Sequence, residues 1–70
     1  MNHYQLVKLL QAKREYNRVA MNKRRVTPTK KQGYIRETTS IDAILNDINN
    51  DLPFHIADGF VSTPSAKVKL

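Results

Sequence analysis

Apolar residues recur at helical spacing over residues 3–26 of the 70-residue chain. Separations of three and four residues alternate along this segment, which is the heptad pattern of a helix that faces a partner on one side. The residues on that line are Leu9, Ala12, Tyr16, Val19, Lys23 and Val26, with Leu6, Leu10 and Ala20 beside them. No Gly or Pro interrupts the segment until Pro28, so the pattern predicts a helix over about 3–26 that packs through its heptad face.

A second amphipathic pattern covers residues 40–51. Its apolar positions, Ile41, Ile44, Leu45, Ile48 and Leu52, fall on one helical face, and Asp and Asn residues occupy the other positions. Ser40, or the threonine before it, can cap the N-terminal end, and an Asn-Asn-Asp run followed by a proline marks the other end. The pattern predicts a helix over about 40–51.

The remaining segments predict short strands. Gly33 is a turn signal, and the Tyr-Ile-Arg-Glu-Thr-Thr run after it has strand composition, so we expect a short strand over 33–39, with a basic loop as the alternative. Asp58-Gly59 lies between two apolar pieces and predicts a hairpin over 54–62, because both residues accept positive φ. We expect one small α+β domain over 1–62 and a flexible C-terminal tail over 63–70.

Charge is divided unevenly along the chain. The formal net charge is +6, made up of +9 over residues 1–36 and −3 over residues 37–70. A basic half of this kind predicts an anionic partner, whereas the acidic half would support the fold or contact a protein.

The basic residues of the first predicted helix suggest a binding face. Arg14, Arg18 and Arg25 are four and then seven residues apart, and guanidinium groups at repeated spacing on a rigid helix suit phosphate oxygens. We therefore expect a binding protein for DNA or RNA, or for a nucleoprotein machine. Its candidate nucleic-acid-binding residues are Lys8, Arg14, Arg18, Arg24, Arg25, Lys30 and Lys31.

Two other interpretations remain open. The cations could form an ordinary solvated helix face that keeps a small domain soluble. Alternatively, the chain is a protein–protein regulator or inhibitor of a larger complex such as a polymerase. In that case it meets an acidic protein surface by charge complementarity, with Phe54, Ile56 and Phe60 as apolar anchors.

Catalytic chemistry has little support in the sequence. His3 and His55 are far apart and belong to no metal-ligand motif, and neither a nucleophile motif nor a phosphate-binding glycine loop occurs. We expect no enzymatic activity, no cofactor, no metal and no small-molecule substrate. The sequence has no cysteine, no signal-peptide pattern and no long apolar run, from which we expect a cytoplasmic protein without membrane contact.

Overall fold

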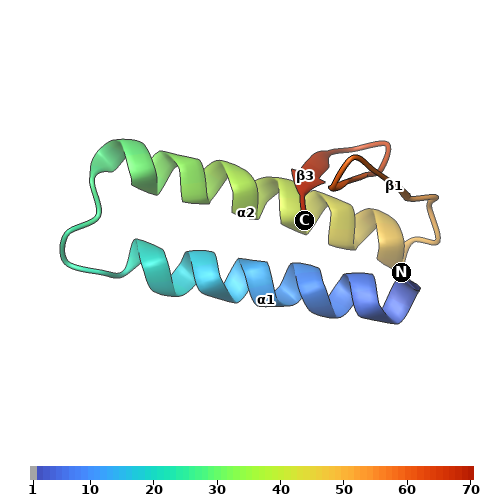
Figure 1. Ribbon diagram of the computed structural model, residues 1–70, viewed down its shortest axis with the longest axis horizontal. Coiled ribbons are helices and arrows are strands. Elements are labelled where there is room, and N and C mark those ends of the chain that lie inside the picture. Colours follow the sequence, from blue (N-terminus) through green and yellow to red (C-terminus); the bar gives the residue numbers. More distant parts are fainter. Residues whose placement is uncertain (1) are drawn as a thin grey trace.

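A computed structural model describes residues 2–70 and shows a helical hairpin followed by a small sheet (Figure 1). The two helices run antiparallel, and the three strands form an antiparallel sheet in the order β1-β2-β3. The small α+β fold predicted from the sequence is thus confirmed. The elements are α1 (His3–Met21), α2 (Pro28–Asn49), β1 (His55–Ala57), β2 (Phe60–Ser62) and β3 (Lys67–Lys69).

Helix α1 begins at a capping box and ends earlier than predicted. The Asn2 side chain accepts a hydrogen bond from the Gln5 amide at 2.8 Å, and the Gln5 side chain accepts one from the Asn2 amide at 3.2 Å. The helix ends at Met21, and the amide of the next residue, Asn22, donates back to the Val19 carbonyl at 3.2 Å. Residues 22–26, predicted as the last helical turn, instead reverse the chain, because α2 has to begin at Pro28 to run back along α1.

The face of α1 that packs is the flank of the predicted apolar stripe, with Leu6, Leu10 and Ala20, and not its heptad line. The buried residues are Leu6, Leu10, Asn17 and Ala20, whereas Tyr16 is 66 % exposed and Val19 is 48 % exposed. The large side chains of Leu6 and Leu10 set the packed face, and the polar Asn17 on the same face obscured its periodicity in the sequence.

Helix α2 includes the segment predicted as a strand and therefore begins well before residue 40. Thr27 is its N-cap, with a side-chain oxygen that accepts from the Lys30 amide at 3.3 Å, and Pro28 takes the first helical position, where a missing N–H costs nothing. Residues 33–39 are helical although Gly33 and the β-branched side chains after it favour other conformations. Thr39, predicted as a possible cap, lies inside the helix and donates its hydroxyl to the Ile35 carbonyl at 2.9 Å.

The predicted hairpin over 54–62 is confirmed. Ala57 pairs with Phe60 across a two-residue turn in which Asp58 and Gly59 have φ of 54° and 77°. Where the sequence predicts a flexible tail over 63–70, the structure has strand β3, with Val68 buried opposite Val61.

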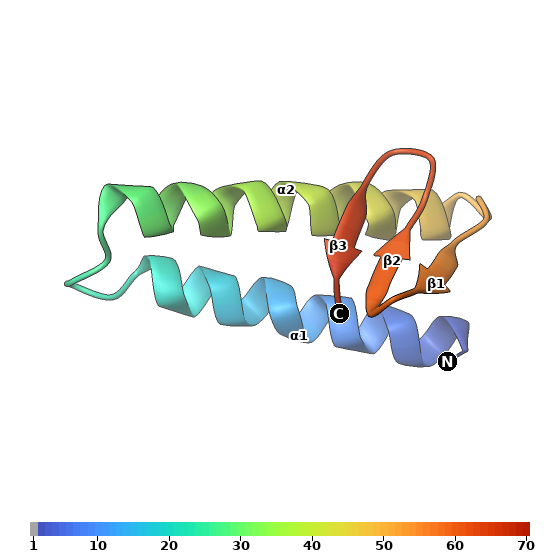
Figure 2. The same ribbon diagram turned by 45° about the horizontal axis from the view of Figure 1, so that its top comes forward.

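A single apolar core lies between the helical hairpin and the sheet. The sheet lies across the half of the hairpin that contains the start of α1 and the end of α2, and the turn between the helices projects beyond it (Figure 2). Neither α1 nor α2, within residues 2–70, combines the length and apolar content that crossing a membrane requires. The buried apolar residues that form this core are Leu6, Leu10, Ile41, Ile44, Ile48, Val61 and Val68.

Candidate nucleic-acid interface

The turn between α1 and α2 carries a concentrated group of cations, which we name the basic tip. All of its members are exposed, and they lie at one end of a molecule that measures 38 Å along its longest axis (Figure 1). The structure therefore brings together four of the predicted site residues and adds one that the prediction omitted, Lys23. The basic tip consists of Lys23, Arg24, Arg25, Lys30 and Lys31.

Side chains, not helix dipoles, give the tip its positive potential. The C-terminal end of α1 and the N-terminal end of α2 lie side by side there, so their opposite partial charges largely cancel. Residues 16–36 contain no Asp or Glu. The first acid after this stretch is Glu37, six residues after Lys31 on α2, about 9 Å along the helical rise and so about one Debye length away at physiological salt.

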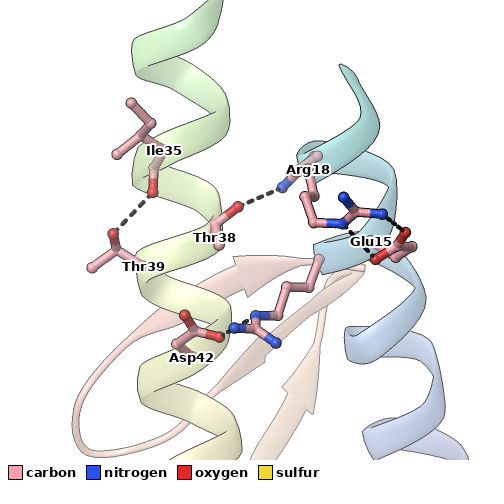
Figure 3. Close-up of polar contacts among 8 residues, drawn as sticks. Glu15, Arg18, Ile35, Thr38, Thr39 and Asp42 are labelled. Carbon is pink, nitrogen blue, oxygen red and sulfur yellow. Dashed lines mark hydrogen bonds and ion pairs between the residues drawn. The ribbon is translucent and has the colours of Figure 1, made fainter. Parts of the chain in front are cut away.

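Two predicted site residues lie away from the tip and pair with acids of the chain itself. Arg14 Nε is 2.7 Å from Asp42 Oδ1, and Arg18 Nε donates to Glu15 Oε2 at 3.0 Å (Figure 3). Both pairs are about half exposed, so solvent competes for them. Part of the predicted arginine face is therefore internally neutralised.

The predicted stripe through Arg14, Arg18 and Arg25 is interrupted, because Arg25 lies in the turn beyond the end of α1. Lys8 is also separate from the tip. It lies one turn after Tyr4 near the beginning of α1, with its Nζ 5.1 Å from the centroid of the Tyr4 ring.

A polar contact connects the two helices close to the basic tip. The buried amide of Asn17 donates to Glu37 Oε1 at 3.0 Å and to Thr38 Oγ1 at 3.4 Å. Because Asn17 is on α1 and its partners are on α2, this contact sets the relative position of the two helices. The contact could not be predicted from the sequence, because a lone Asn in a basic helix gives no signal of burial.

The predicted protein-contact residues do not form one exposed surface. Phe54 packs against the core, and Phe60 is partly buried with the Lys67 Nζ 4.9 Å from its ring centroid. Ile56, at 40 % exposure, is the most accessible of the three.

A buried acid at the end remote from the tip holds the sheet to α2. Asp47, placed on the polar face by the sequence pattern, is only 3 % exposed and accepts from the Ser65 amide at 3.0 Å and the Ser65 hydroxyl at 2.9 Å. The nearby Thr63 hydroxyl, and then the Ser65 donors, lower the pKa of Asp47 by favouring its charged form, while burial opposes them. The buried Thr63 oxygen lacks a hydrogen bond of ordinary geometry, so Ser65 is the partner that the distances establish.

In the exposed Glu15–Arg18 pair, each residue shifts the pKa of the other. The hydrogen bond from Arg18 lowers the pKa of Glu15, and the same bond raises the pKa of Arg18. Both groups therefore remain charged at neutral pH, and Arg18 keeps a carboxylate beside it.

Residues 2–70 contain no group of three or more His, Asp or Glu side chains positioned to hold a metal ion. The chain matches no known family model, no curated protein and no solved structure. The interpretation of the site therefore depends on its own geometry and charge.

Proposed function

We propose that this protein is a small non-enzymatic regulatory protein that binds nucleic acid by placing its basic tip against the phosphate backbone. The observation that supports this most directly is the set of five exposed cations at the helical turn. Among residues 2–70 the ion pairs are Arg14–Asp42 and Arg18–Glu15, so the cations of the tip remain without an internal carboxylate partner.

The chemistry of the tip suits phosphate contacts more than base recognition. Arginine side chains form forked hydrogen bonds to phosphate oxygens, and lysines add mobile positive charges. The nearest aromatic candidate for base stacking, Tyr34, is half-buried within α2. Backbone contacts of this kind give binding that depends strongly on salt and weakly on sequence.

The shape of the molecule supports the same proposal. The tip projects past the sheet, so a large polyanion can approach it without meeting the strands (Figure 2). Asp51 lies two residues after the end of α2, away from the tip, and the resulting charge asymmetry would orient the protein so that the tip meets a polyanion first.

Fluorescence anisotropy with a labelled 20-base-pair DNA duplex and the matching RNA duplex tests the proposal. If about five tip cations meet phosphates, log K should fall with log salt at a slope of roughly −4.5, which lowers the affinity about 500-fold between 50 and 200 mM salt. In the variant R24Q/R25Q, the slope of log K against log salt should be less steep by about 2.

The matched control is K8Q/R18Q, which also removes two positive charges but from exposed positions of α1 outside the tip. It should change the slope by less than about 1. Equal losses in both variants would place the contact along α1 and contradict the proposal, as would failure of the wild type to bind either duplex at about 50 mM salt.

A further inference from the structure

Three more cations lie together where β3 meets α2. Arg36 comes from α2, and Lys67 and Lys69 come from β3 some thirty residues later in the chain. With Ser40, they line an open hollow of about 210 Å³. We name Arg36, Lys67 and Lys69 the β3 cluster; β3 is the strand nearest the basic tip, so the cluster borders the uncovered part of the hairpin (Figure 2).

The backbone of β3 adds hydrogen-bond donors beside these side chains. The Thr63 amide donates to the Ala66 carbonyl at 2.9 Å, and the Leu70 amide donates to the Gly59 carbonyl at 2.8 Å. Because hydrogen-bonded and non-hydrogen-bonded pairs alternate in an antiparallel ladder, Lys67 and Lys69 between these bonds direct their amides away from β2. Since β3 is an edge strand, these two amides point to the open side of the sheet.

One acid shares the hollow with the three cations. Glu37 also lines it, and its Oε1 accepts the hydrogen bond from Asn17 of α1 at 3.0 Å, which orients the carboxylate without removing its charge. Neither ion pair described for residues 2–70 includes a member of the β3 cluster. The cluster therefore combines three cations, of which Lys67 has its Nζ 4.9 Å from the Phe60 ring centroid, with two outward amides and the Ser40 hydroxyl. Groups of these kinds bind phosphate oxygens in proteins.

We propose that the β3 cluster is a second phosphate-binding site and that it binds the same nucleic acid as the basic tip. This inference rests on the proposed function of the tip. Arg36 follows Lys30 by six residues on α2, which is a rise of about 9 Å. A duplex carries one negative charge per roughly 1.7 Å of its axis, so a short segment presents phosphates to both sites together.

The variant K67Q/K69Q tests the second site in the same anisotropy assay with the DNA and RNA duplexes. Both lysines are exposed, so the glutamines should leave the melting transition nearly unchanged. The salt slope should become less steep by about 2, because each lost phosphate contact removes about 0.9. K8Q/R18Q carries the same net charge and again serves as the control.

Two further measurements test the second site even if K67Q/K69Q disturbs the folding of the strand. Arg36→Gln, which changes α2 and leaves the strand intact, should reduce the steepness by about 1. In an NMR titration of the wild type with the unlabelled DNA duplex, the backbone amides of Lys67 and Lys69 should shift, because they point to the proposed phosphate.

The possible outcomes separate the second site from the tip. In one outcome, R24Q/R25Q has a less steep salt slope while K67Q/K69Q and Arg36→Gln have the same slope as the control. The proposal of a second site would then be wrong, and the proposed function of the tip would stand. If the wild type binds neither duplex, both proposals are wrong. Competition by polyglutamate as effective as that by duplex at equal charge would contradict both, since it indicates an acidic protein surface as the partner.

Discussion

Arg14 Nε lies 2.7 Å from Asp42 Oδ1, so a basic residue of α1 is joined to an acidic residue of α2. Asp42 is five residues before the buried Asp47, which places the two acids about 140° apart around the helix. One acid of α2 therefore contacts α1 while the other holds the connection between β2 and β3. The acidic half of the chain therefore contacts other elements at both places.

The Arg14–Asp42 pair should contribute little to stability in spite of its short distance. Both side chains are about half exposed, so water and salt screen the pair. A double-mutant cycle with Arg14→Ala and Asp42→Ala, measured by urea unfolding, should give a coupling energy of about 0–1 kcal/mol. A coupling energy above about 2 kcal/mol would show that the pair is an essential link between the helices.

A charge at Ile44 should unfold the domain. Ile44 is fully buried, and Ile44→Asp places a carboxylate among apolar side chains, so no cooperative melting transition should be seen by circular dichroism. The matched control is Ile35→Asp on the same helix, where 40 % exposure lets the carboxylate reach water and the transition should persist. An unchanged transition in Ile44→Asp would contradict the packing described here.

Replacing each of the two glycines by alanine should change the stability of the fold in opposite directions. Gly59→Ala should destabilise the fold by about 1 kcal/mol, because the residue has φ of 77° in the hairpin turn. Gly33 lies inside α2 with nothing within 4 Å of an added Cβ, so Gly33→Ala should stabilise the fold by about 0.5–1 kcal/mol. Thermal unfolding measures both changes, and a destabilising Gly33→Ala would argue against helix at that position.

Acid should weaken the fold through Asp47. The folded state lowers the pKa of this carboxyl, so its contribution is complete above the ordinary value near 4 and is lost as pH falls through the lower folded value. Urea unfolding between about pH 7 and pH 2.5 should therefore show a decline in the free energy of unfolding below about pH 4. Asp47→Asn should be less stable at neutral pH and show a smaller decline.

Glu15 titrates in the same direction and needs its own control. Its pKa is also lowered, by the hydrogen bond from Arg18, but the pair is exposed and salt screens it. Repeating the pH series in Arg18→Gln removes this partner and leaves Asp47 intact. If the acid decline disappears in Arg18→Gln and persists in Asp47→Asn, the assignment to Asp47 is wrong.

The hairpin and the apolar face of α2 could be predicted from sequence because each depends on local signals. Asp58-Gly59 specifies a turn by its backbone preferences alone, and Ile41, Ile44 and Ile48 repeat at helical spacing. The strand expected over 33–39 failed because tertiary contacts override local preference there. Asn17 of α1 donates hydrogen bonds to Glu37 and Thr38, which lie in that segment and take part in the contact as residues of α2.

The charge of the site was evident in the sequence, but its arrangement was not. The acid-free stretch from 16 to 36 indicates a concentration of cations, whereas the partners of Arg14 and Arg18 depend on how the chain folds. The β3 cluster joins residues about thirty positions apart. Lys67-Val68-Lys69 has a period-two pattern, with an apolar residue between two charged ones, but three residues are too few to predict a strand.

The start of α1 lies at the opposite end of the molecule from the turn between the helices (Figure 1). A biotin or fluorophore attached ahead of Asn2 would therefore sit far from the five cations. Molecules captured on a sensor surface by that handle would all present the same end to solution. The chain can thus be immobilised in one orientation without masking the residues whose binding is to be measured.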